Sequence, residues 1–237
     1  MNDFDALVTN TQATLNRIAG EFTPAVFASS LAAEDMVLTD LILRAKLPID
    51  VFTLETGRLH KETLGVLDRI KETYDYDVTL YRPEPAAVDA YVQQNGLNAF
   101  YDSVDMRKEC CRIRKVEPLK RALAGNKAWI TGQRRSQSTT RAALDIQEQD
   151  DTHGMLKFNP LADWSEEDVW HYIRSNKVPY NPLHDKGYPS IGCEPCTRAI
   201  QPGEDVRAGR WWWETSESKE CGLHVVDGKL VRIKSVA

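Results

Sequence analysis

Residues 25–54, AVFASSLAAEDMVLTDLILRAKLPIDVFTL, form the stretch that decides the fold. Residues 25–28 and 49–54 are short runs of apolar and β-forming side chains, and a helical pattern from Asp35 to Ala45 separates them. Because two strands joined by a helix of this length form a βαβ unit, the two strands are expected to be parallel. This stretch therefore predicts the beginning of a parallel sheet.

The alternation of strands and helices continues after residue 54. The order of these elements is typical of α/β proteins, and it predicts a doubly wound, mostly parallel sheet with helices on both faces. The further elements that we expect are a helix from about Leu59 to Thr73, a strand at 77–81, a basic helix that ends near Ala124 and a strand at 128–131.

Polar loops follow three of the expected strands. Ligands of doubly wound sheets bind beyond the carboxyl ends of the strands. The first of these loops also precedes a helix, whose N-terminal N–H groups favour an anion, although a serine pair at such a place often serves only as a helix cap. The candidate substrate-binding residues at these strand ends are Ser29, Ser30, Glu55, Thr56, Gly57 and Gly132.

The chain changes character after residue 150. Ser165 and Asp168 have the spacing of a capping box and predict a helix that ends near Ser175. Residues 179–210 are rich in Pro and Gly and are expected to form loops interrupted by short helices. The part of the chain that follows has the composition of a terminal appendage to the main body.

Composition and charge exclude several classes of protein. A net charge of −5 argues against a general nucleic-acid-binding protein, and no apolar run is long enough to cross a membrane. The acidic N-terminus lacks the features of a secretory signal, so we expect a cytoplasmic protein with no nucleic-acid or membrane partner. Basic residues gather in 107–121 and 127–141, which predicts either a pocket for a compact anion or a basic helix face that acids elsewhere balance.

Cysteine placement is the strongest signal of function. Cys110 and Cys111 are adjacent, Cys193 and Cys196 form a Cys-x-x-Cys pair, and Cys221 stands alone. The first four could hold an iron–sulfur cluster or a zinc ion, form a disulfide switch, or be inert. Adjacent ligands favour a cluster, because they point apart on a helix and can reach separate metal atoms. Cys221 is either a small buried side chain or a nucleophile, and its cationic neighbours favour the reactive thiolate.

Seven motifs run in order along nearly the whole chain: SSLAAED at 29–35, LETGR at 54–58, KECCRIRK at 108–115, TGQRRS at 131–136, IGCEPCTR at 191–198, RWWWE at 210–214 and KECGLH at 219–224. Together they resemble the assimilatory sulfonucleotide reductases, specifically the cluster-containing adenylyl-sulfate (APS) reductases. The resemblance implies an adenine nucleotide α-hydrolase-like fold with a C-terminal catalytic tail. It also divides the chain into a nucleotide- and cluster-binding α/β domain, 1–206, and a segment that carries the nucleophile, 207–237.

The resemblance implies a cofactor and an activity. It assigns one [4Fe–4S] cluster to Cys110, Cys111, Cys193 and Cys196, and it makes Cys221 the nucleophile. The implied activity is reduction of APS to sulfite and AMP in sulfate assimilation. Family members that reduce the 3′-phosphorylated nucleotide, PAPS, typically lack the cluster cysteines, which this chain has. Some cluster-bearing relatives accept both nucleotides, so a PAPS reductase or a dual-specificity enzyme stays open.

The cysteine count predicts the partner. A Cys221 thiolate would attack the sulfur of APS and leave an enzyme S-sulfocysteine. The chain has no sixth cysteine to resolve this intermediate, and the other four are committed to the cluster. The thiol that releases sulfite should therefore come from a dithiol protein of the thioredoxin or glutaredoxin type.

Four basic side chains are candidates for binding the phosphosulfate. Lys115 lies four residues after Cys111, and α-helical spacing would place both on one face, where Lys115 could bridge the cluster and the sulfate. Arg207 and Arg210 have helical spacing, and arginine suits paired oxygens. His224 would reach the same anion when the C-terminal segment closes. Taken singly, each cation could instead be a solvated surface charge, and His224 a packing residue.

Two further classes of protein remain open. An ATP pyrophosphatase of the same fold would not need Cys221. A non-enzymatic iron–sulfur sensor would keep its function in Cys221→Ser and lose it without Cys110, whereas a reductase would lose turnover in Cys221→Ser. The sequence leaves open whether the chain forms a homo-oligomer, and the three tryptophans at 211–213 are expected to pack the core or hinge of the terminal segment.

Overall fold

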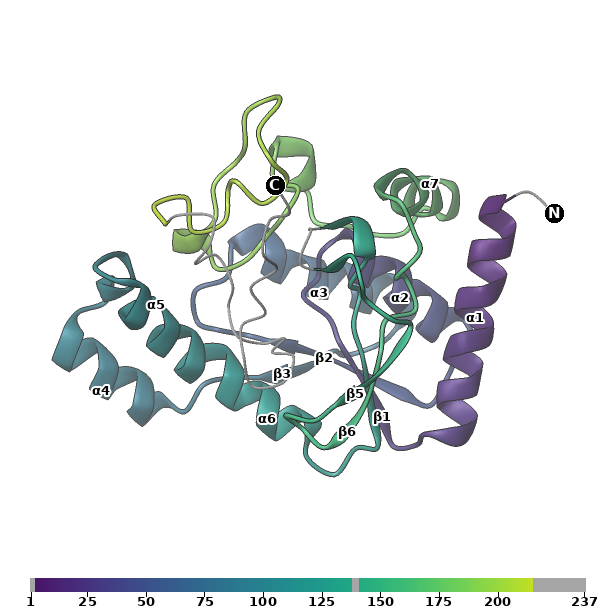
Figure 1. Cartoon of the computed structure of the whole chain (residues 1–237), viewed down its shortest axis with the longest axis horizontal. Helices are drawn as coiled ribbons and strands as arrows, with labels where there is room; N and C mark the ends of the chain where they lie inside the picture. The colour runs from purple at the N-terminus through teal and green to yellow at the C-terminus, as the bar shows by residue number, and fades with distance from the viewer. Residues whose placement is uncertain (1–2, 138–140, 215–237) are drawn as a thin grey trace, which may run out of the picture.

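The computed structural model describes residues 3–137 and 141–214, which contain a six-stranded sheet covered by helices (Figure 1). Its strands are β1 (Ala25–Ala28), β2 (Ile49–Leu54), β3 (Thr79–Tyr81), β4 (Ala128–Ile130), β5 (Gln147–Asp150) and β6 (Met155–Phe158). They lie in the order β3-β2-β1-β4-β6-β5. Neighbouring strands are parallel except β5 and β6, which form an antiparallel pair at one edge.

The α-helices are α1 (Asp3–Glu21), α2 (Ala33–Arg44), α3 (Lys61–Tyr74), α4 (Pro85–Asn95), α5 (Val104–Cys111), α6 (Glu117–Leu123) and α7 (Glu166–Asn176). Buried residues of α1, α2, α3 and α7 pack with Phe27 and Ile130 on one face of the sheet. Helix α6 packs with Val26 and Trp129 on the other. Neighbouring strand residues enter different cores because they point to opposite faces. None of these helices is long and apolar enough to span a membrane.

The doubly wound, mostly parallel sheet predicted from the sequence is confirmed. The strands expected at 25–28 and 49–54 coincide with β1 and β2, whereas β3 and β4 are shorter than predicted. The sequence does not predict the β5–β6 pair, because QEQD at 147–150 carries no apolar alternation and every second residue is exposed. Helices α1 and α4 were likewise not identified from the pattern.

The predicted basic helix consists of three parts. Helix α5 ends at Cys111, a π-helical turn follows (η2, Arg112–Val116), and α6 begins at Glu117. A π turn closes its hydrogen bonds one residue later than an α turn. The turn between Cys111 and Lys115 is therefore π-helical and not α-helical, and four residues are close to one turn in either geometry.

From Ser165 onward the described chain follows the prediction. Ser165 caps α7, since its hydroxyl accepts a hydrogen bond from the Asp168 N–H while the Asp168 carboxylate accepts one from the Ser165 N–H. After α7, the short 3-10 helices η5 (His184–Lys186) and η6 (Glu194–Cys196) interrupt a long stretch of loops. These loops lie over the carboxyl ends of the strands, above the sheet in Figure 1.

Strand β1 marks the point where the winding of the sheet reverses. From β1 the chain continues to β2 and β3 on one side, whereas β4 and β6 lie on its other side. The loops that follow β1 and β4 therefore diverge, and a crevice at such a switch point is where doubly wound proteins bind ligands.

Candidate active site

A pocket of about 810 Å³ opens at this switch point. The loops after β1, β2 and β4 line it together with residues from 187–193 and 200–211. Glu55 and Gly57 are not among its lining residues, and the Glu55 carboxylate instead accepts hydrogen bonds from the Gly57 N–H (2.7 Å) and from Arg82 Nε (3.2 Å). The predicted site residues that the pocket brings together are Ser29, Ser30, Thr56, Lys115, Gly132, Arg207 and Arg210.

In the loop after β1, hydrogen-bond donors of Ser30 and Leu31 bond to other groups of the protein. Ser30 donates from its N–H (2.6 Å) and its hydroxyl (2.5 Å) to Asp35 Oδ2, and the Leu31 N–H donates to the Ser29 hydroxyl (3.2 Å). The other oxygen of Asp35 lies against Gly132, where an added Cβ would come within 2.1 Å of it. A carboxylate of the chain itself therefore fills the position at which the sequence predicts a bound anion.

Asp35 titrates near neutral pH. Burial raises the pKa of this carboxyl to about 6, the neighbouring Glu34 adds to the rise, and the hydrogen bonds from Ser30 and Gly132 oppose it. A buried carboxylate beside a ligand pocket is a recurrent property of functional sites.

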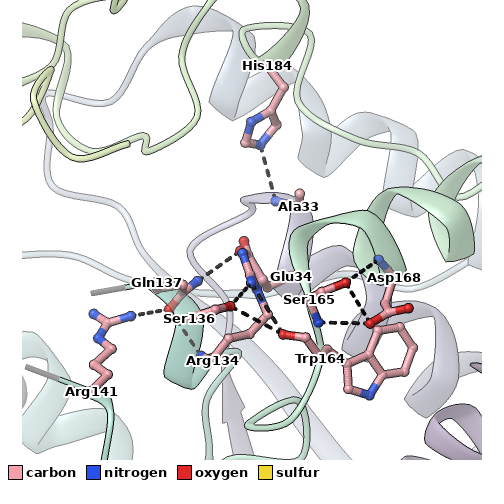
Figure 2. A network of polar contacts seen from close by, with 10 residues as sticks. All are labelled: Ala33, Glu34, Arg134, Ser136, Gln137, Arg141, Trp164, Ser165, Asp168 and His184. Carbon is pink, nitrogen blue, oxygen red and sulfur yellow. Dashed lines mark hydrogen bonds and ion pairs between the residues drawn. The ribbon is translucent and has the colours of Figure 1, made fainter. Parts of the chain in front are cut away.

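Glu34 is the centre of a polar network that joins α2 to the loop after β4 (Figure 2). Arg134 donates to Glu34 Oε1 from Nε (3.0 Å) and Nη2 (2.8 Å), and Gln137 donates to the same oxygen (2.9 Å). Arg141 in turn donates to the Gln137 side chain. All four residues line the pocket. The network fixes this part of the pocket wall, and the carboxylate of Glu34 balances the charge of Arg134.

His184 lies against the first turn of α2 (Figure 2). Its Nε2 accepts a hydrogen bond from the Ala33 N–H (3.2 Å), and its ring stands edge-on to Trp170. Burial lowers the pKa of His184 below its usual value. The imidazole therefore acts as a neutral cap for this helix, whose own N-cap residue, Ala32, has no side-chain acceptor.

A second cavity, of about 20 Å³, is lined by all four of the predicted cluster ligands, Cys110, Cys111, Cys193 and Cys196. These four cysteines are free thiols. Within 3–137 and 141–214, no group of three or more His, Cys, Asp or Glu side chains is arranged to hold a metal ion. The four thiols thus line a common cavity, but they are not arranged around one point as the ligands of a single metal ion would be.

Two separate parts of the fold bring the thiols together. Cys110 and Cys111 end helix α5, while Cys193 and Cys196 flank η6. The Cys193 loop pairs with the segment after β2. Leu59 forms an antiparallel β-bridge with Cys193, and the N–H of Glu194 donates a hydrogen bond to the Arg58 carbonyl (2.7 Å). Thr56 Oγ1 lies 3.2 Å from Cys193 Sγ in a buried contact.

Burial dominates the titration of Cys110 and Cys196. It raises the pKa of Cys196 to about 12, and the neighbouring thiols Cys193, Cys111 and Cys110 add to the rise while Lys115 opposes it. Burial also raises the pKa of Cys110, against the opposing charge of Arg114. As free thiols these groups are therefore protonated at neutral pH and are poor nucleophiles.

The pocket and the cysteine cavity share a wall. Lys115, Cys193 and Trp211 line both of them. Arg210 Nη1 donates to the Ile191 carbonyl (3.2 Å), and its guanidinium stacks on the Trp211 ring at 4.7 Å. Two of the cationic residues predicted to bind phosphosulfate, Lys115 and Arg210, therefore lie at the end of the pocket nearest the cysteines.

A buried ion pair lies beneath this wall. Arg107 donates from Nε to Glu214 Oε1 and from Nη2 to Glu214 Oε2, both at 2.8 Å, and the two side chains are 0% and 4% exposed. Burial opposes the charge of Arg107, but the hydrogen bonds and charges of Glu214 and Cys111 together outweigh it and raise the pKa of the guanidinium. The pair joins α5 to the last described residue of the chain.

Comparisons with known proteins identify the family. The model described as "Phosphoadenosine phosphosulfate reductase domain" matches residues 24–199. The chain belongs to this family. It is 60% identical over 220 residues to "Adenosine 5'-phosphosulfate reductase" of Burkholderia cepacia, which covers 93% of this chain and 88% of the relative. It is also 60% identical over 212 residues to a Neisseria meningitidis protein of the same name, which covers 89% of this chain and 86% of that protein.

Solved structures agree with membership of the phosphoadenosine phosphosulfate reductase family. The phosphoadenylyl-sulfate (PAPS) reductase of Candida auris, crystallised as a phosphate complex, superposes with a TM-score of 0.69 at 26% identity, over 84% of this chain and 98% of that one. The FMN adenylyltransferase of Candida glabrata superposes with a TM-score of 0.56 at 15% identity, over 92% of this chain and 74% of that one. This second likeness concerns the fold alone.

Several site residues of this family member were not predicted from the sequence. Glu34 and Asp35 stand in the first turn of a helix, where acids are common, so only their place in the SSLAAED motif marked them. Nothing in the sequence shows that distant pairs such as Arg107 and Glu214 meet. The further unpredicted residues are Arg134, Gln137, Arg141 and His184. The predicted nucleophile Cys221 and His224 lie outside the described residues.

Proposed function

We propose that this family member reduces adenylyl sulfate to sulfite and AMP in assimilatory sulfate reduction. The proposal rests on the wall between the pocket and the cysteine cavity, which is formed by Lys115, Cys193 and Trp211. A large pocket at the switch point of the sheet suits a nucleotide, and its basic end directs an anionic group toward the cysteines. The relatives at 60% identity are named for the reduction of this same nucleotide.

Cys110, Cys111, Cys193 and Cys196 would hold one [4Fe–4S] cluster. Their fit to such a group rests on four free thiols around one cavity, which is the donor set of these clusters. Arg114 and Lys115 are close enough to offset the charge of thiolates, since both oppose the rise in the pKa of Cys110. When bound, the cluster would position and polarise the phosphosulfate and would not pass electrons to it.

Substrate binding divides between the two ends of the pocket. Lys115, Arg207 and Arg210 would bind the phosphosulfate, because arginine and lysine donors suit its oxygens. The strand-end residues would bind the adenosine part, and the internal hydrogen bonds of the loop after β1 support this division. These residues are Ser29, Ser30, Thr56 and Gly132, which line the pocket, whereas the predicted Glu55 and Gly57 do not.

The covalent step would use Cys221, carried by the segment 207–237 against the body formed by 1–206. Its thiolate attacks the sulfur of APS, an S–S bond forms, and the S–O bond to the phosphate breaks. AMP leaves with the electron pair, and Cys221 becomes an S-sulfocysteine. His224, three residues on, would bind the same anion.

Release of sulfite requires an external dithiol. A thiolate of a thioredoxin- or glutaredoxin-type protein attacks Cys221 Sγ, and sulfite leaves with the electron pair of the S–S bond. The second thiol of that protein then breaks the mixed disulfide and returns the Cys221 thiolate. The two electrons come from the dithiol, because the chain offers no sixth cysteine.

Mass spectrometry of anaerobic holoprotein incubated with APS or PAPS, without reductant, tests the proposal. A single SO3 adduct on Cys221 from APS is expected, and Cys221→Ser should retain its iron and form none. An adduct from PAPS as well would mean dual specificity. The absence of an adduct from either nucleotide, on protein that contains iron, would exclude the covalent mechanism and favour the sensor or pyrophosphatase alternatives.

A further inference from the structure

The ion pair between Arg107 and Glu214 lies in an unusual place for two charges. Both side chains are almost fully buried, and both hydrogen bonds are 2.8 Å long. Removing two charges from water costs free energy, and apolar residues of the same size often stabilise a fold as well or better. A buried pair of this kind is therefore better explained by the geometry that it imposes than by the stability that it adds.

The pair connects the two parts of the chain that the proposed reaction must bring together. Arg107 lies on α5 one turn before Cys111, so the two side chains share a helix face. Glu214 lies seven residues before Cys221 and is the last described residue of the chain. The residues just before Glu214 also contact the body, since the Trp211 N–H donates to the Cys196 carbonyl (3.1 Å) and the Trp213 ring packs on Tyr101.

The Trp211 ring continues the connection toward the substrate pocket. The Arg107 guanidinium lies 4.6 Å from the centre of this ring, and the Arg210 guanidinium lies 4.7 Å from it. Arg210 also has anchors of its own, at Ile191 and Ser190. Loss of the Glu214 carboxylate should thus leave Arg210 in place while it removes the ion pair that lies seven residues before Cys221 in the sequence.

We infer that the Arg107–Glu214 ion pair is a positioning contact, which fixes the base of the C-terminal segment on the cysteine-bearing helix so that Cys221 meets the substrate in a reactive orientation. The inference rests on the proposed role of Cys221. It requires the pair to act on the covalent step and not on substrate binding or on the cluster. A bidentate pair suits this role because its two parallel hydrogen bonds fix direction as well as distance.

The test is a single-turnover experiment on anaerobic holoprotein at saturating APS without reductant, in which the SO3 adduct on Cys221 is followed with time. Glu214→Gln should slow adduct formation at least tenfold, because small misplacements of reacting groups carry costs of this size. Its iron content and visible absorption should match wild type. In a Cys221→Ser background, it should change the dissociation constant of APS less than about threefold.

Two further variants make the result decisive. Glu109→Gln breaks the Arg112–Glu109 pair, which is also bidentate and lies on the same helix but is exposed, so it should react like wild type. The double variant Arg107→Met, Glu214→Leu replaces the buried pair by apolar side chains and should fold, and its iron content is measured beside its rate because Arg107 also contacts Cys111. It should still react slowly, because packing alone does not fix direction.

The outcomes separate this inference from the proposed function. Adduct formation at the wild-type rate in Glu214→Gln or in the apolar double variant overturns the positioning role. A parallel loss of rate, APS affinity and iron would show a merely structural role and would overturn it too. If wild-type holoprotein forms no adduct on Cys221, the proposed nucleophile is wrong and the positioning role falls with it.

Discussion

At the scale of single residues, Asp35 shows how contacts decide a role that the sequence does not reveal. As part of SSLAAED it is an ordinary first-turn acid of a helix. In the folded chain its carboxylate accepts the two donors of Ser30 and abuts Gly132. A phosphate at this loop would meet a negative charge, which leaves Lys115, Arg207 and Arg210 as the favoured partners of the phosphosulfate.

Asp35 also predicts how stability depends on pH. Its pKa is raised from 3.8 to about 6, so between these values the folded state binds more protons than the unfolded state, and stability falls as pH rises. The full cost is on the order of 3 kcal/mol, of which roughly 1 kcal/mol lies between pH 5 and pH 7.5. Urea unfolding at these two pH values should show a change of stability with rising pH that is more negative by roughly 1 kcal/mol in wild type and in the exposed control Asp77→Asn than in Asp35→Asn, because other titrating groups such as His184 contribute equally to all three proteins. An equal loss in Asp35→Asn would contradict the raised pKa.

Gly192 makes room for Arg210. A Cβ at this position would come within 2.5 Å of Arg210 Nη2 and 2.7 Å of Cζ, so Gly192→Ala must displace the guanidinium. Because a hydrogen bond to a charged group contributes about 1.5–3 kcal/mol, the KM for APS should rise about tenfold or more. Steady-state kinetics measures the effect. The control is Gly65→Ala, which should leave KM unchanged because Gly65 has open space around it. If the KM of Gly192→Ala equalled that of wild type, a role for Arg210 in substrate binding would be excluded.

At the scale of elements, the sequence predicts best what is local. Residues 25–28 and 49–54 form strands because their apolar side chains suit burial on both faces of a parallel sheet. The edge strand QEQD at 147–150 offers no such pattern. The π turn at Arg112–Val116 was also not predicted from the sequence. Lys115, within this turn, lines both cavities.

The capping box of α7 carries a prediction at this scale. Ser165→Ala removes the acceptor for the Asp168 N–H (3.0 Å) and should lower the free energy of unfolding by about 1 kcal/mol. For a chain of this length that corresponds to a fall in Tm of about 2–4 °C. Calorimetry compares it with Ser175→Ala, an exposed serine on the same helix whose replacement should not lower Tm. Equal Tm values for Ser165→Ala and wild type would mean that the cap adds nothing to stability.

At the scale of the whole molecule, the topology joins residues that the sequence keeps apart. Motif order predicted that the cysteine pairs at 110–111 and 193–196 act together, and they line one cavity. The sequence alone did not predict the shared wall with the pocket, because it depends on the loop of Cys193 pairing with the segment after β2. Long-range pairings of this kind follow from the whole fold and carry no local signature.

The cysteine cavity therefore predicts that metal binding stabilises the whole fold. A cluster held by both pairs would link α5 to the η6 loop, some eighty residues further along the chain, and binding free energy of this kind adds to folding free energy. Cys196→Ser should lose iron and visible absorption, and its Tm should fall by about 5 °C or more, which corresponds to about 2 kcal/mol. Wild type stripped of iron by a chelator should show the same Tm, while Cys221→Ser should keep both iron and Tm. If Cys196→Ser retained wild-type iron, the four thiols would not be the ligands of one group, and the coupling between cofactor and fold argued from the cavity would be wrong.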